Sequence, residues 1–110
     1  MKALLVLTTV PDRELAEELA RGLVEARLAA CVSILAPCQS VYRWEDLIEA
    51  ASEIPLLIKT TSGRYRAIEQ AIRERHPYEL PEILAVATDK GLPAYLEWIA
   101  SETAAETQRP

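Results

Sequence analysis

The stretch KALLVLTTVPDRELAEELARGLVEARL, residues 2–28, decides the fold. Residues 2–10 carry aliphatic side chains in every register, which predicts a β-strand with apolar side chains on both of its faces. From Asp12 onward the leucines recur at steps of about four residues, the spacing of one face of an amphipathic helix, and Asp12 is a typical N-cap residue. We therefore expect a strand over residues 2–10 and a helix over residues 12–28.

Strand and helix signals alternate along the rest of the chain. Residues 31–44 are rich in Val, Ser and Tyr and predict one strand that is broken or bulged at Pro37, since proline cannot donate to a sheet. Residues 45–53 are acidic and predict a connection. The remaining elements that we expect are strands over residues 54–61 and 82–88 and helices over residues 64–75 and 94–102.

The expected order of elements is β-α-β-β-α-β followed by one more helix. This is the order of the split β-α-β unit, the ferredoxin-like fold. The predicted fold class is therefore α+β, a ferredoxin-like βαββαβ sandwich of four antiparallel strands with two helices on one face and an additional C-terminal helix.

Length and composition predict one globular domain. The chain has 110 residues, of which half are hydrophobic and about a quarter are charged, which excludes a disordered chain or a disulfide-stapled miniprotein. We expect a single domain over residues 1–103 and a frayed tail over residues 104–110. The apolar runs fall short of the roughly 20 residues of a membrane-spanning helix, and a signal-peptide cleavage site does not follow the first one. We expect a cytoplasmic protein without membrane contacts.

The charge balance argues against nucleic acid as a partner. The formal net charge is −5, and nucleic-acid binders usually present a basic stripe. The most basic segment contains Arg64, Arg66, Arg73 and Arg75, but glutamates dilute it.

Apolar residues on both faces of the sheet predict self-association. In the first strand Leu4 and Val6 point to one face and Leu5 and Leu7 to the other, and the later strands repeat this pattern. Two helices cover one face, and one short third helix is too small for the other. Each aliphatic side chain left in water forgoes about 1.5–3 kcal/mol of burial, so the uncovered face predicts an interface. The alternative is a different fold, with the sheet between helices on both faces.

The two cysteines and the single histidine are the first candidates for chemistry. Cys31 and Cys38 lie about 20 Å apart in an extended chain, too far for a disulfide. They are either small buried hydrophobic residues or soft metal ligands. His76, at the end of the second helix, either complements the helix dipole or acts as a metal ligand or acid–base group.

Aromatic and charged residues form the second set of candidates. Tyr42 and Trp44 alternate in a strand and share a face, either in a cleft or interface or in ordinary half-buried packing. Lys59 ends an apolar strand and needs a carboxylate or solvent, and Glu82 is the candidate partner in a structural ion pair.

Five segments together resemble the CutA divalent-cation-tolerance family. In order along the chain they are LAACVSI at 28–34, SVYRWE at 40–45, IKT at 58–60, HPYELPEI at 76–83 and YLEWI at 95–99. The resemblance spans residues 3–100. It implies a ferredoxin-like subunit, a tight homotrimer related in architecture to the nitrogen-regulatory signal trimers, and a link to copper and other divalent metal ions.

The site residues that we expect on this basis fall into two groups. Metal ligands would come from His76, Glu79, Glu82 and Cys31. An inter-subunit cleft would be lined by Tyr42, Trp44, Lys59, Tyr78 and Glu82. The only cofactor expected is a weakly bound Cu²⁺ or another divalent metal ion.

The chain departs from the family pattern at three positions. Thr8 and Arg75 stand where some bacterial members linked to copper carry a cysteine and a second histidine, so His76 alone remains of that ligand set. Asp46 stands at the expected hairpin tip, where the family usually has glycine.

Three hypotheses for the function follow. The first is a trimeric protein of metal tolerance that binds divalent ions weakly. The second is a trimeric ligand sensor or scaffold with clefts between subunits. The third is an enzyme with Glu82 or His76 as general base, which we do not expect, because no nucleophile–base pair is evident.

Overall fold

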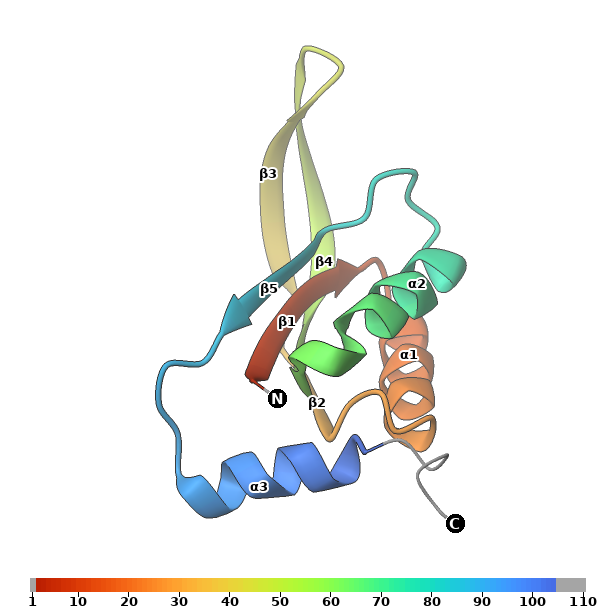
Figure 1. The fold of residues 1–110 in the computed structure, drawn as a ribbon. Helices are drawn as coiled ribbons and strands as arrows, with labels where there is room; N and C mark the ends of the chain where they lie inside the picture. The colour runs from red at the N-terminus through yellow and green to blue at the C-terminus, as the bar shows by residue number, and fades with distance from the viewer. Residues whose placement is uncertain (1, 105–110) are drawn as a thin grey trace.

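The structure, a computed structural model, describes residues 2–104. Its elements are β1 (Ala3–Val10), α1 (Arg13–Glu25), β2 (Cys31–Ile34), β3 (Cys38–Trp44), β4 (Leu47–Thr61), the short 3₁₀ helix η1 (Ser62–Arg64), α2 (Tyr65–Arg75), β5 (Ile83–Ala87) and α3 (Pro93–Glu102). Figure 1 shows α1 and α2 on the same side of the sheet, the β3–β4 hairpin extending as an arm, and α3 across the opposite end.

The sheet is antiparallel throughout. Its order is β2-β4-β1-β5, and β3 pairs with the outer half of β4. This confirms the predicted mixed α+β fold with an antiparallel sheet. No helix within residues 2–104 is long and apolar enough to cross a membrane. The predicted tail lies, apart from Ala104, outside the described residues.

The predicted acidic connection over residues 45–53 is wrong. Residues from Leu47 to Glu53 instead extend β4 and pair with β3, and only Glu45 and Asp46 form the turn. Both turn residues have positive φ, 50° for Glu45 and 69° for Asp46. A two-residue hairpin turn with this backbone geometry matches the right-handed twist of the two strands that it joins. Acidic residues fit this part of the strand because every residue from Val41 to Ala50 is exposed, so their charges stay solvated.

The predicted break near Pro37 is confirmed, and it shifts the strand register. Ile34 pairs with Leu56 and Cys38 pairs with Glu53, so four steps on one strand match three on β4. This one-residue excess is a β-bulge. As a result, even-numbered residues of β3 lie on the sheet face that odd-numbered residues of β2 occupy.

The first sheet face forms the core with α1 and α2. Its fully or nearly fully buried members include Val6, Leu56, Ile58, Leu19 and Ile72. The predicted N-cap of α1 is confirmed, because Asp12 Oδ1 accepts a 2.8 Å hydrogen bond from the Leu15 N–H. The helix ends at Glu25 rather than at Leu28, because the backbone turns left-handed at Arg27, with φ of 60°.

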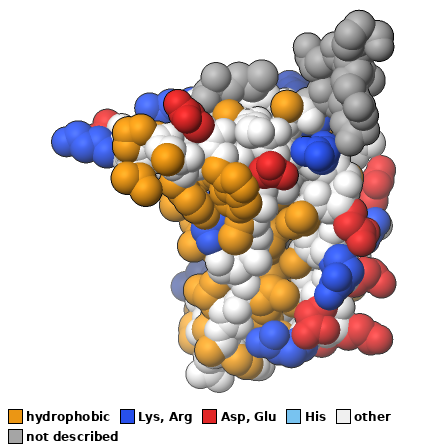
Figure 2. Space-filling model, turned by 90° about the horizontal axis from the view of Figure 1, so that it is seen from below, with side chains coloured by type: hydrophobic (Ala, Val, Ile, Leu, Met, Phe, Trp, Pro, Cys, Tyr) orange, Lys and Arg blue, Asp and Glu red, His pale blue; other side chains and the backbone are white. Residues whose placement is uncertain are grey.

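The second sheet face stays largely uncovered within the chain. Leu84 and Val86 of β5 are 59% and 53% exposed. Helix α3 covers only the end of the sheet, where Ile99 packs against Ala3 and Ala30. The predicted two-sided apolar sheet is therefore confirmed, and the alternative with helices on both faces is wrong. Figure 2 shows hydrophobic side chains gathered in a broad area on the side seen from below.

The C-terminal end of α3 is held by two arginines from distant segments. Arg27 Nη1 donates to the carbonyl oxygen of Glu102 at 3.2 Å, and Arg64 Nε donates to that of Thr103 at 2.8 Å. Cations at this end complement the helix dipole and satisfy carbonyl groups that the helix leaves free. These contacts fix α3 while leaving Leu92, Tyr95 and Trp98 exposed.

We predict that Thr8→Val stabilises the protein. The Thr8 side chain is 1% exposed, and its Oγ1 has no hydrogen-bond partner among the described residues. Valine has nearly the same shape and removes the unsatisfied hydroxyl, so the free energy of unfolding should rise by about 1 kcal/mol. Urea unfolding followed by circular dichroism measures the change.

Thr60→Val is the matched control. Thr60 is equally buried, but its hydroxyl donates to the Leu28 carbonyl at 2.6 Å. This substitution should lower the free energy of unfolding by about 1 kcal/mol. Equal effects of the two substitutions would show that the Thr8 hydroxyl is satisfied in solution.

Candidate functional site

His76 fixes the loop between α2 and β5 to the end of β1. The helix ends here because Pro77 cannot continue it, and His76 is extended, with ψ of 133°. Its Nε2 donates to the Thr9 carbonyl oxygen at 2.6 Å, and its Nδ1 accepts from the Tyr78 N–H at 3.1 Å. Both ring nitrogens are thus engaged by backbone groups, and a metal ion at His76 would have to displace one of them.

Tyr78 lies against His76 and is directed toward β4. The two ring centroids are 4.6 Å apart with a tilt of 55°. Burial raises the pKa of Tyr78 above its ordinary value of 10.0, and so do the negative charge of Glu53, a side-chain hydrogen bond to Glu53 and the nearby Tyr42. The loop therefore places the Tyr78 phenol near Glu53 of β4 and Tyr42 of β3.

Glu53 is a site residue that the sequence interpretation missed. It is 6% exposed, an unusual burial for a carboxylate, and it pairs with Cys38 at the base of the arm. The sequence interpretation missed it because the acidic composition of residues 45–53 predicts a connection rather than a strand. The available signal was its position directly before the apolar run that starts at Ile54.

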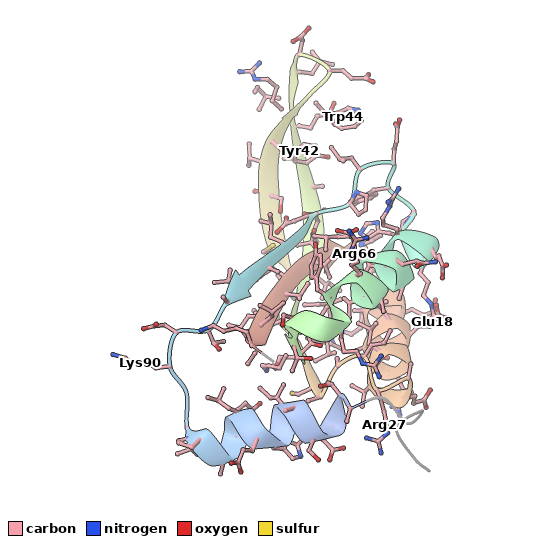
Figure 3. The ribbon with its side chains drawn as sticks, viewed as in Figure 1. Glu18, Arg27, Tyr42, Trp44, Arg66 and Lys90 are labelled. Atoms are coloured by element: carbon pink, nitrogen blue, oxygen red, sulfur yellow. The ribbon has the colours of Figure 1, made fainter. Side chains whose placement is uncertain are left out.

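Tyr42 and Trp44 share the face of the arm on which Glu53 lies. Tyr42 pairs with Glu49 and Trp44 with Leu47, and residues directly opposite each other in antiparallel strands point to the same face. The two aromatic side chains are 42% and 37% exposed. Figure 3 shows both on the side of the arm that faces the loop before β5.

We call Tyr42, Trp44, Tyr78, Glu49 and Glu53 the aromatic–acid cluster. It combines three of the predicted cleft residues with two carboxylates that were not predicted. The cluster forms because the bulge before β3 sets the face of Tyr42 and the His76 contacts place Tyr78. Its rings are partly exposed, and its innermost carboxylate is buried.

Lys59 lies apart from this cluster, and its predicted ion pair with Glu82 is wrong. Its Nζ donates to Ser33 Oγ at 2.6 Å and to Cys31 Sγ at 3.7 Å. Lys59 pairs with Leu5 of β1, and Leu5 pairs with Val86 of β5. Val86 is four residues from Glu82, which corresponds to about 13 Å along the strand. The sequence put the two residues at strand ends but did not give the register.

The cysteines are not the buried hydrophobic residues that one interpretation predicted. Both are free; Cys38 is exposed and Cys31 is half-buried. The Lys59 ammonium group beside the Cys31 sulfur disfavours a cation there, because like charges repel.

The four predicted metal ligands do not come together within the chain. Cys31 pairs with Lys59, whereas His76 bonds to Thr9, which pairs with Pro55, about 13 Å further along β4. Glu79 and Glu82 are exposed on the loop beside His76. Within residues 2–104, no group of three or more His, Cys, Asp or Glu side chains is arranged to hold a metal ion. The donors of a single subunit thus do not fit a tight site.

Comparison with known families identifies the fold. Residues 4–102 match the model of the CutA1 divalent ion tolerance protein family. The chain belongs to the CutA1 family. The match covers every element of the sheet and the three α-helices, so the CutA resemblance of the sequence motifs is confirmed.

Individual CutA relatives agree in sequence and in structure. The divalent-cation tolerance protein CutA of Thermus thermophilus is 41% identical over 98 residues, which are 89% of this chain and 95% of the relative. The protein CutA of mouse is 41% identical over 86% of this chain, but this chain spans only 54% of the mouse protein. The crystal structure of CutA from Xylella fastidiosa superimposes with a TM-score of 0.91 at 44% identity, covering 94% of this chain and all of that one.

We predict that Tyr78 makes stability fall at alkaline pH. Because its pKa is raised in the folded chain, the fold keeps a proton that the unfolded chain loses near pH 10. This contribution to stability is complete below pH 10 and is lost as the pH rises through the folded pKa. Urea unfolding of wild type and Tyr78→Phe at several pH values around and above 10 should show a shallower fall for the variant.

Glu53→Gln provides the second arm of this test. It keeps a hydrogen-bond acceptor for Tyr78 but removes the charge that contributes to the raised pKa. The fall in stability should again begin near pH 10, but it should end at a lower pH and be smaller. An identical pH dependence in wild type and Tyr78→Phe would contradict the assignment.

Proposed function

We propose that the chain is a homotrimer that takes part in the response to divalent metal ions and binds Cu²⁺ weakly. The observation that carries the proposal is the uncovered apolar face of the sheet in a chain of the CutA1 family. The family description names divalent ion tolerance, and the Thermus relative carries the same designation.

The uncovered face supports assembly. Leu84, Val86 and Leu47 are each more than half exposed, and Leu92 of α3 is 71% exposed. Contiguous apolar surface of this extent is typical of an interface between subunits. A closed ring with cyclic symmetry would cover the same surface in every copy. A trimer, the assembly that the family resemblance implies, satisfies this requirement.

Weak copper binding follows from the donors in one subunit. Imidazole suits Cu²⁺, but both nitrogens of His76 are engaged by the backbone. Carboxylates of Glu79 and Glu82 are available beside it, and any further donor would come from a neighbouring subunit or from water. The cost of breaking a backbone contact lowers the affinity further.

We propose no catalytic role for the chain. A general base needs a free lone pair, and His76 uses both ring nitrogens in holding the loop. We also propose a cytoplasmic location, in keeping with two cysteines that remain free.

A ligand-sensing or scaffolding trimer is the second candidate function. The aromatic–acid cluster supports it, because partly exposed aromatic rings share a face of the arm with the buried Glu53 carboxylate. Metal response and ligand sensing would use different residues, so the two functions can be separated by substitution.

We predict saturable Cu²⁺ binding at about micromolar affinity or weaker, which His76→Ala reduces tenfold or abolishes. The reason is that His76 carries the only imidazole in the chain. Calorimetric titration of Cu²⁺ into both proteins at neutral pH makes the measurement.

Tyr78→Phe serves as the control for disturbance of the loop. It removes the hydrogen bond to Glu53 but leaves the backbone N–H that contacts His76. Its copper affinity should equal that of wild type. Indistinguishable isotherms for wild type and His76→Ala would remove His76 from the copper site.

A further inference from the structure

Strand β2 forms one edge of the sheet and presents backbone groups that no neighbouring strand uses. Among residues 2–104, β4 is the one strand that pairs with β2. The Leu35 N–H donates to the Pro55 carbonyl oxygen at 3.0 Å, so these two residues form a hydrogen-bonded pair. Because such pairs alternate in an antiparallel ladder, the N–H and C=O groups of Ile34 and Val32 point away from β4. This edge can therefore accept a further strand.

An open groove of about 330 Å³ lies beside this edge, between β2 and α1. Its apolar lining consists of Ala20 and Val24 of α1 and Val32 and Ile34 of β2. Val24 is 42% exposed although it lines the groove, so α1 has apolar surface that β2 does not cover. Helix α1 thus reaches past the last strand, and the groove is the space that side chains of one more strand would occupy.

The groove lies apart from the surface that supports assembly. Val32 pairs with Ile58 of the core, and Ile34 follows two residues later, so both side chains lie on the sheet face that α1 and α2 cover. Leu84 and Val86 lie on the opposite face, and β5 forms the opposite edge of the sheet. Covering that second face with further copies does not by itself close the groove.

The charges of α1 favour a basic occupant. Residues 12–25 carry five acidic and two basic side chains. Glu17 and Glu25 line the groove, about 12 Å apart along the helix, with Arg21 between them. Glu17 also forms a 4.0 Å ion pair with Arg13, but both of these side chains are more than half exposed, so the pair is weak. Positive charges about 12 Å apart on the occupant would complement the two glutamates.

This spacing matches an extended peptide. Every second residue of a strand points to the same face, so residues four apart lie about 13 Å from each other on one face. A segment with basic, apolar and basic residues at alternate positions would place the apolar side chain over the floor of the groove. The aliphatic parts of the flanking lysine or arginine side chains would cover the remaining apolar surface while their charges reach the rim.

We propose that the free edge of β2 and the groove beside it bind an extended basic segment of a partner protein. The segment adds a strand to the sheet, with its main chain bonded to Val32 and Ile34 and its basic side chains at Glu17 and Glu25. This partner site goes beyond the proposed metal response and uses none of the residues of the aromatic–acid cluster.

The exposed strands of a second copy fit this groove less well. Residues 79–90, which contain β5, carry three acidic side chains and one basic side chain. Residues 38–46, which contain β3, carry two acidic side chains and one basic side chain. Both segments would bring negative charge to an acidic helix, and like charges repel. The charge balance therefore favours a different chain as the occupant.

Fluorescence anisotropy with the labelled peptide TKTITKT tests the proposal. The anisotropy should rise saturably, with a dissociation constant of about 100 μM. The peptide TETITET, in which glutamate replaces lysine, should bind at least tenfold more weakly. TKTITKT with N-methyl groups on its isoleucine and lysine nitrogens should also bind at least tenfold more weakly, because it has lost the N–H groups that pair with the edge.

Two substitutions and two matched controls locate the binding site. Val24→Lys puts a positive charge into the groove and Glu25→Lys reverses a charge at its rim, and each should weaken binding at least threefold. Val41→Lys makes the first change on the arm, where Val41 is 67% exposed, and Glu18→Lys makes the second on α1 outside the groove lining. Both controls should bind TKTITKT as wild type does.

Each outcome decides the proposal. Loss of affinity in Val24→Lys and Glu25→Lys alone supports it. An absent saturable rise, equal affinity for the N-methylated peptide, or equal affinity in Val24→Lys and Val41→Lys would overturn it. Sedimentation of the same samples tests the other occupant: a trimer that Val24→Lys dissociates and Val41→Lys does not would make the groove a contact between copies and refute the peptide site. A wild-type monomer that binds TKTITKT would support the peptide site and refute the trimer.

Discussion

Strand β1 lies at the centre of the sheet with apolar side chains on both faces, and this one constraint governs the rest of the molecule. Helices α1 and α2 bury the face that carries Val6 and Val10. Residues 2–104 provide no comparable layer for the face of Leu84 and Val86, because α3 reaches only the end of the sheet. The energy of leaving those side chains in water is as large as the stability of a typical domain. The sheet itself is therefore the main support for the proposed assembly with further copies.

The candidate site depends on two local features at the other end of the sheet. The bulge between β2 and β3 reverses the facing of the arm, which places Tyr42 and Trp44 on the same side as Glu53. The histidine at the end of α2 then ties the following loop to Thr9 and positions Tyr78 above that carboxylate. His76, which the sequence suggests as a metal ligand, thus holds the loop before β5 against the end of β1.

Much of the fold could be predicted from periodicity and turn signals, and the errors have physical causes. The Asp12 cap, the interruption at Pro37 and the two-sided sheet follow from local residue chemistry, which the sequence contains. The sequence interpretation missed the outer half of β4 because acidic residues are equally well solvated in a loop and in a projecting hairpin, so the composition does not distinguish the two. The Lys59–Glu82 pair failed for a different reason: register depends on long-range pairing, which strand boundaries alone do not give. Glu53 was missed with the strand that holds it.

Sedimentation equilibrium of the purified protein and of Leu84→Lys, at micromolar concentration, tests most directly whether the uncovered face is an interface. Leu84 is 59% exposed and does not belong to the buried core that residues 2–104 form, so a lysine there should leave the fold of a monomer intact. The account predicts a wild-type particle of three 12.2 kDa chains and dissociation of the variant, because a charge buried in the interface is costly. A stable wild-type monomer of 12.2 kDa would contradict it.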